Sequence, residues 1–118
     1  MKSYTDVEQS KKLAEILPLE SADMTHCWFG KALNVDCYEV SFGRNTINDK
    51  NIPCWSLGAL INILGSKSDH VRIGGSVGYW WCKPSFSDIS KYTGFADGDE
   101  LVDVCCKMIF KLKEKNLI

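Results

Sequence analysis

The sequence predicts an α+β domain in which about three α-helices pack on one face of an antiparallel β-sheet. Apolar residues recur at helical spacing in three stretches, and they alternate with polar residues at strand spacing in the segments between them. The connections between the expected strands are short, which favours antiparallel pairing. Helices that cover one face of such a sheet give a two-layer architecture.

Length and charge restrict the classes of function. The 118 residues are 45% hydrophobic, which predicts one domain spanning residues 1–118 around a single core. The 14 basic and 15 acidic residues give a net charge of -1. A domain that holds nucleic acid by its phosphates normally has a basic excess, so nucleic acid is not an expected partner, although a local basic patch is compatible with these totals. Since the chain shows neither a membrane-length apolar run nor the apolar core of a signal peptide, we expect a cytoplasmic protein without a membrane partner.

The first helix is expected from about Asp6 to Leu17. Thr5 and Glu8 have the spacing of a capping box, in which each side chain accepts a hydrogen bond from the backbone of the other residue. Pro18 should end the helix, because the residue before a proline is disfavoured in the helical region.

The second helix is expected from about Cys54 to Leu64. Pro53 is compatible with the first turn of a helix, and Gly65 is typical of the position just after its end. Because apolar residues such as Leu60 and Ile61 surround this helix almost completely, it is predicted to be the most buried helix of the chain.

The third helix has the most regular pattern. Asp97 is expected to cap it, with Glu100 at its third position, and acidic residues precede basic ones along it, as the helix dipole favours. Its predicted buried stripe consists of Leu101, Val104, Cys105, Met108, Ile109 and Leu112.

The strands are expected between these helices. A short strand is predicted near Met24 to Phe29, and a half-buried strand is predicted from Asp36 to Phe42, where apolar and polar residues alternate. The polar segment Gly43 to Asn51 is expected to be a surface loop. A hairpin is predicted between His70 and Cys82, and a further short strand from Lys91 to Phe95.

The register of the hairpin decides the candidate site, and two loop lengths are compatible with the sequence. A Gly74-Gly75 loop groups Val71 and Ile73 with Trp80 and Cys82, and His70 and Arg72 with Val77, Tyr79 and Trp81. A Gly74-Gly75-Ser76 loop groups Val71, Ile73, Val77, Tyr79 and Trp81 on one apolar face. We favour the second loop because register follows the hydrophobic pattern when one face is buried. It leaves Trp80, Arg72 and His70 as the predicted surface for a protein partner or for a second copy of the chain.

The cysteines give the alternative site. Zinc sites usually contain paired ligands two to four residues apart, and the chain has no such pairs, so no metal, cofactor or disulfide is expected. Cys54 or Cys27, with His26 or His70, is the candidate nucleophile of a small cysteine-dependent enzyme, but nothing in the sequence places a base or an oxyanion hole beside it. The six cysteines are Cys27, Cys37, Cys54, Cys82, Cys105 and Cys106.

Three segments carry a resemblance to known sequences. Ser10 to Met24 (SKKLAEILPLESADM), Ile52 to Leu64 (IPCWSLGALINIL) and Glu100 to Ile118 (ELVDVCCKMIFKLKEKNLI) resemble a group of small uncharacterised proteins encoded by phages and mobile elements of gut bacteria. The match covers somewhat less than half of the chain. It implies a cytosolic accessory protein and carries over no active-site residues.

These observations favour a non-enzymatic protein-interaction module as the function. A small cysteine-dependent enzyme is the alternative, and a nucleic-acid-associated accessory protein is the second alternative.

Overall fold

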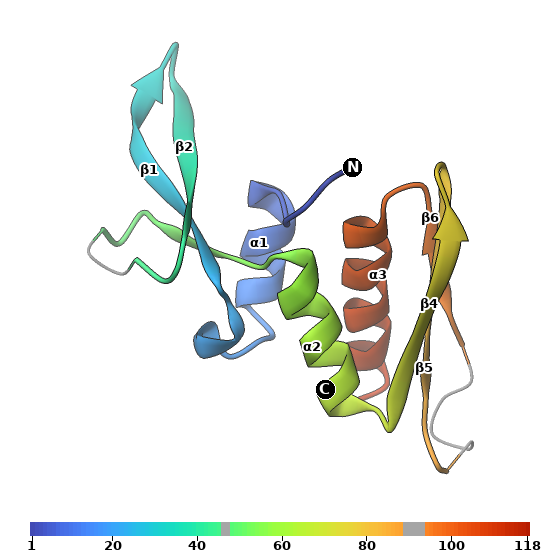
Figure 1. Ribbon diagram of the computed structural model, residues 1–118. Helices are drawn as coiled ribbons and strands as arrows, with labels where there is room; N and C mark the ends of the chain where they lie inside the picture. The colour runs from blue at the N-terminus through green and yellow to red at the C-terminus, as the bar shows by residue number, and fades with distance from the viewer. Residues whose placement is uncertain (46–47, 89–93) are drawn as a thin grey trace. The chain divides into compact units, whose positions relative to one another are not determined.

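The computed structural model of the protein describes residues 1–45, 48–88 and 94–118 (Figure 1). Within these ranges it contains three α-helices and two antiparallel sheets of three strands each, which confirms the predicted α+β class. The strands therefore form two sheets, where the sequence had suggested one. Contacts divide the chain into an N-terminal unit, residues 4–56, and a C-terminal unit, residues 1–3 with 57–118. That a single domain spans residues 1–118 stays a prediction.

The N-terminal unit combines one helix with the first sheet, whose strand order is β2-β1-β3. In Figure 1 strands β1 and β2 form a long hairpin. Strand β3 pairs with the first residues of β1. Helix α1 packs against β3. The elements are α1 (Val7–Ala14), a short 3-10 helix (Leu19–Ser21), β1 (Met24–Ala32), β2 (Val35–Phe42) and β3 (Ile52–Cys54).

The predicted cap of the first helix was displaced by one residue. The Asp6 carboxylate accepts a hydrogen bond from the Gln9 backbone at 2.8 Å, and the Gln9 side chain accepts one from the Asp6 backbone at 3.1 Å. Thr5 is instead completely buried. The observed cap differs from the predicted one because Thr5 and Asp6 are both good cap residues, and the burial of Thr5 leaves Asp6 to cap the helix.

Both predicted strands of the N-terminal unit are present, and both are longer than predicted. They are joined by Leu33 and Asn34, which both have positive φ, as in the primed turns that match the twist of a hairpin. The register shifts between Trp28 and Gly30, so Phe29 is the extra residue of a β-bulge. The sequence did not predict this turn, because leucine is uncommon at a positive φ.

The predicted start of the second helix was wrong. Pro53 lies in β3, where it is opposite Thr25 of β1, and the helix begins only at Leu57. A proline without an N–H is tolerated on an edge strand as well as in the first turn of a helix. Gly65 does not end this helix, which continues to Lys67.

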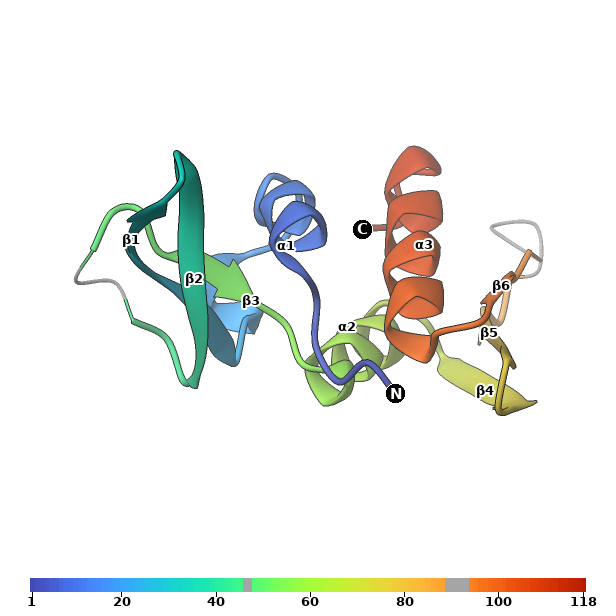
Figure 2. The ribbon, with the colours of Figure 1, turned by 90° about the horizontal axis from the view of Figure 1, so that it is seen from above.

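The C-terminal unit has the second sheet, with strand order β4-β5-β6. Helix α3 packs on β5 and β6, and α2 contacts both α3 and β4 (Figure 2). Of the strand predicted from Lys91 to Phe95, residues 91–93 lie outside the described residues, and Phe95 directly precedes β6. The elements are α2 (Leu57–Lys67), β4 (His70–Ser76), β5 (Tyr79–Ser85), β6 (Ala96–Gly98) and α3 (Leu101–Glu114).

The most buried helix is α3, and the prediction that assigned this place to α2 was wrong. All six residues predicted for the buried stripe of α3 are buried, together with Val102 and Cys106. In α2 the buried residues are Leu60, Ile63 and Leu64, and Ile61 is half-buried. The residue before α3 is Glu100, and Asp97 lies in β6 instead of capping the helix.

Both predicted loops of the C-terminal hairpin were wrong. Ser76 pairs with Tyr79, so the turn is Val77-Gly78, and Gly78 supplies the positive φ that this turn uses. The observed pairs place Val71 and Ile73 on one face with Trp80, Cys82 and Pro84. His70, Arg72, Tyr79, Trp81 and Lys83 share the opposite face. This grouping is the one that the rejected shorter loop would have produced.

We predict that Leu60→Ala destabilises the protein by about 2–5 kcal/mol, because Leu60 is completely buried and its truncation leaves a cavity. Urea unfolding followed by circular dichroism measures the change. Val77→Ala in the same unit is the control, since Val77 is almost fully exposed in the hairpin turn. Equal stabilities of the two variants would contradict the assignment of Leu60 to the core.

Candidate functional site

The structure does not bring the three predicted surface residues together. His70 and Arg72 lie on the exposed face of the β4-β5-β6 sheet, whereas Trp80 lies on the face that carries buried Cys82. Trp80 is half-buried and lines a hollow near the Val77-Gly78 turn. The aromatic residue that shares a face with Arg72 is Trp81.

Cys54, a candidate nucleophile, belongs to a buried network centred on Thr5. The Thr5 N–H donates to the Trp55 carbonyl at 3.0 Å, and the Thr5 carbonyl accepts from the His26 ring at 2.8 Å and from the Cys54 thiol at 3.5 Å. The Thr5 hydroxyl contacts Ser10 at 2.7 Å and accepts from the Trp55 backbone at 3.1 Å. His26 and Cys54 thus share the Thr5 carbonyl as an acceptor.

This environment makes Cys54 a structural residue. Burial is the largest influence on its thiol and raises the pKa of Cys54 above its usual value, and the nearby Asp23 charge acts in the same direction. Hydrogen bonds from Thr5 and Ser10 oppose the rise in pKa without reversing it. A nucleophilic cysteine needs a lowered pKa and access to substrate. Cys54 is completely buried, so it has neither property.

Three other cysteines, Cys27, Cys82 and Cys105, do not combine an accessible thiol with an adjacent histidine. Cys27 contacts the Ser41 hydroxyl at 3.3 Å, and His26 points to the opposite face of β1 because neighbouring strand residues alternate. Cys82 and Cys105 are completely buried between β5 and α3, where they are hydrogen-bonded to each other. That hydrogen bond lowers the pKa of Cys82 and raises the pKa of Cys105.

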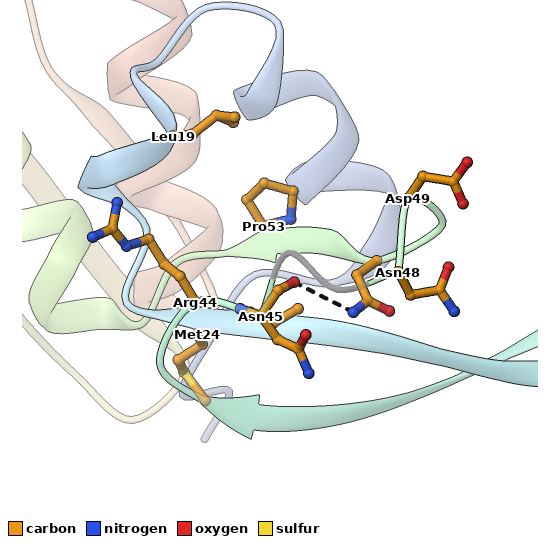
Figure 3. Close-up of a pocket in the computed structure, with 9 residues that line it drawn as sticks. Leu19, Met24, Arg44, Asn45, Asn48, Asp49 and Pro53 are labelled. Carbon is orange, nitrogen blue, oxygen red and sulfur yellow. Dashed lines mark hydrogen bonds between the residues drawn. The ribbon is translucent and has the colours of Figure 1, made fainter.

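The N-terminal unit contains a pocket of about 250 Å³ with an apolar floor. Met24 from the start of β1, Pro53 from β3 and Leu19 from the 3-10 helix line the floor. In Figure 3 Leu19 and Pro53 lie on one side of the β1 ribbon, and Met24 lies on the other side of that ribbon. Met24 and Pro53 lie on the neighbouring strands β1 and β3, so sheet pairing positions both residues.

The rim of the pocket is polar and comes from the loop between β2 and β3. Arg44, Asn45, Asn48, Asp49 and Asn51 line it, and Figure 3 shows Arg44 and Asp49 extending from opposite ends of the loop. The pocket therefore offers a cation and an anion at its edges and amide groups between them. These groups provide both donors and acceptors of hydrogen bonds.

Hydrogen bonds to β1 hold this rim in place. The Thr25 hydroxyl donates to the Gly43 carbonyl at 2.8 Å and accepts from the Asn45 N–H at 3.0 Å. The Asn51 amide accepts from the Trp28 backbone at 2.9 Å and donates to the Asn45 carbonyl at 3.3 Å. Gly43, Asn45 and Asn51 are thus tied to β1, which fixes this part of the rim before a ligand binds.

Exposed apolar side chains lie beside the pocket. Phe42 is directly opposite Met24 in the β1–β2 pairing, yet it is 91% exposed. Leu19, part of the pocket floor, is 55% exposed. Sequence reasoning treated Gly43 to Asn51 as an ordinary surface loop and missed this site. The available signal was the density of asparagines around a short strand, since asparagine side chains often hydrogen-bond to nearby backbone.

We predict that Thr5→Val destabilises the protein by about 1–3 kcal/mol, because it removes the hydroxyl and leaves the buried Trp55 N–H without its acceptor. Thr5→Ser is the matched control, since it keeps the hydroxyl. Thermal unfolding of the two variants measures the difference. A Thr5→Val protein as stable as Thr5→Ser would contradict the role of the hydroxyl.

We also predict that Cys54 resists alkylation in the folded protein. Because burial raises its pKa, the thiolate fraction at pH 7 is smaller than for an ordinary thiol. Iodoacetamide treatment followed by peptide mass spectrometry should label the half-buried Cys27 and Cys37 first, and Cys54 at a comparable rate only in urea. Rapid labelling of Cys54 at neutral pH in native buffer would support the enzyme alternative.

The described residues contain no group of three or more His, Cys, Asp or Glu side chains placed to hold a metal ion. None of the helices that the structure describes is long and apolar enough to cross a membrane. No family model, no curated protein and no solved structure matches the chain.

Proposed function

We propose that this protein is a non-enzymatic binding module, active in the cytoplasm, that takes an apolar side chain of a protein partner into the pocket of its N-terminal unit. The observation that carries the proposal is the combination of an apolar floor with a polar rim, in which hydrogen bonds hold Asn45 and Asn51 in place. Such sites bind through the floor and orient the ligand through the rim.

The chemistry of the lining favours binding over catalysis. Among the described residues that line the pocket, the Thr25 hydroxyl and the Asp49 carboxylate are the groups that could act as nucleophiles, and the hydroxyl is already hydrogen-bonded to Gly43 and Asn45. Arg44 and Asp49 can orient a ligand by charge. An activated nucleophile needs an adjacent base, and among the described residues no hydrogen bond joins Thr25 to Asp49. The cysteine-dependent alternative loses support with the burial of Cys54.

The size and surroundings of the pocket favour a peptide segment as the ligand. A volume of about 250 Å³ is below the usual range for drug-sized ligands and is suited to one or two side chains. The exposed Phe42 and Leu19 extend the apolar contact beyond the pocket, as expected where a partner covers the surrounding surface. The amide rim can pair with the polar backbone of the partner.

Titration with N-acetyl-L-leucinamide, monitored by amide NMR, tests this proposal. The probe has few atoms, so an affinity on the order of 1 mM is expected. The amide signals of Thr25 and Asn45 should shift, because these residues line the pocket. N-acetyl-L-alaninamide should shift them much less, since its side chain covers little of the floor. Equal shifts for both probes, or none, would overturn the proposal.

Leu19→Asp should abolish the shifts by placing a charge at the mouth of the pocket. Leu33→Asp is the matched control in the same unit, because Leu33 lies in the hairpin turn, does not line the pocket and has a positive φ that aspartate tolerates. Both positions are exposed, so neither change should affect folding. Loss of binding in both variants would indicate that the pocket is not the binding site.

A further inference from the structure

We propose that the exposed face of the β4-β5-β6 sheet binds single-stranded nucleic acid, with Tyr79 and Trp81 stacking on bases and Arg72 and Lys83 contacting phosphates. The proposal concerns the C-terminal unit and does not depend on the pocket. It rests on the observed hairpin register, which places these four residues on one face.

The two aromatic residues form a fixed platform. Trp81 is opposite Gly74, and its indole lies against the backbone there, since a Cβ on Gly74 would come within 2.5 Å of the Trp81 ring. Tyr79 lies on the same face, about 7 Å further along β5, and it is 49% exposed. Its hydroxyl donates to the Asp97 carboxylate at 3.2 Å. Both rings are thus oriented before any ligand arrives, and base stacking on such rings tolerates any sequence.

The two cations form an unfavourable pair in the free protein. Arg72 and Lys83 are direct cross-strand partners on the exposed face, and opposed like charges destabilise a sheet. Salt bridges join neither of them to any residue that the structure describes, and the chain positions outside that part carry no acidic residue. A bound phosphate between the two cations would relieve this repulsion. His70, two residues before Arg72 on β4, lies on the same face.

The arrangement favours nucleic acid over an acidic peptide. An acidic peptide would use the two cations, but it has no groups that stack on both rings. Asp97, opposite Trp81, would repel a peptide carboxylate among the rings, whereas a base amino group can donate to it. A single strand is favoured because bases in a duplex are stacked on one another and cannot reach the rings.

The overall net charge of -1 does not argue against this surface. The C-terminal unit has nine basic and seven acidic residues, so the acidic excess of the chain comes from the N-terminal unit. Binding by two phosphate contacts should be weak and strongly dependent on salt.

Fluorescence anisotropy with a labelled oligothymidylate of about 12 nucleotides tests the proposal, because this length covers the site of a typical single-strand-binding domain. Binding should appear at low salt, with a slope of log K against log salt of about -1.4, the value for two phosphate contacts on a single strand. Quenching of tryptophan fluorescence should accompany it. The absence of binding at low salt would overturn the proposal.

Variants distinguish this surface from general electrostatic attraction. Trp81→Leu should weaken binding by about 5- to 160-fold, and Trp81→Phe, which keeps a ring, should weaken it less. Arg72→Gln and Lys83→Gln should each reduce the salt slope by about 0.7. Lys113→Gln, on the exposed side of α3, is the control and should leave the slope unchanged. Equal effects of all the lysine and arginine changes would overturn the assignment.

Competitors test the class of partner. A duplex of the same length should compete much less than the single strand, because its bases are not available for stacking. Polyglutamate should displace the oligonucleotide only at far higher concentration, and displacement at equal charge concentration would identify an acidic protein surface as the partner instead. The fold of each variant is checked by circular dichroism, and Trp81→Phe keeps the test informative if Trp81→Leu does not fold.

Discussion

The N-terminal unit depends on the burial of Thr5 with all of its polar groups satisfied. The backbone N–H, the carbonyl and the hydroxyl of Thr5 each have a partner, and these partners come from α1, β1 and the segment after β3. A buried polar group without a partner costs about 1–3 kcal/mol, so the segments can only meet in an arrangement that satisfies them together. The hydrogen bonds of one residue therefore fix the positions of three parts of the chain.

That constraint extends to the pocket. With Trp55 held by Thr5, β3 must pair with the start of β1, and this places Pro53 beside Thr25 and Met24. Strands β2 and β3 are on opposite sides of β1, so the connection between them links the two sides. The Thr25 hydroxyl holds Gly43 and Asn45 at the start of this connection. The pocket lies between the described residues of the connection and the apolar floor.

Periodicity in the sequence predicted the elements whose burial is one-sided. The stripe of α3 was sufficient, because its pattern is compatible with a single orientation of the helix. The alternation from Asp36 to Phe42 predicted a strand but not its burial, since no residue of β2 is buried and Phe42 is 91% exposed. The start of α2 was not predictable in this way, since Pro53 suits an edge strand as well as a first helical turn. Threonine is likewise a common helix-capping residue, and only the long-range partners of Thr5 show why it is buried instead.

The site was harder to predict than the fold, because both candidate surfaces depend on contacts between distant residues. The pocket joins Leu19, Met24 and Pro53, which no periodicity relates. The hairpin register depends on which glycine forms the turn, and the sequence offers Gly74, Gly75 and Gly78 close together. The hydrophobic pattern favoured the wrong register, since it assumed that Tyr79 and Trp81 were core residues.

The hydrophobic pattern predicted the wrong hairpin register because β5 carries large aromatic side chains on both of its faces. Both faces of β5 bear an aromatic residue, so some large ring must remain outside the core in either register. The observed register buries Cys82 and Pro84 against α3 and places Tyr79 and Trp81 beside a repulsive cation pair. Alternation along β5 puts Lys83 on the same face as the two rings, so the rings and this cation are buried or exposed together, and the observed face also carries two opposed like charges. Sites at which local rules are broken without a gain in stability are those where a binding function is expected, and the exposed sheet face is such a site.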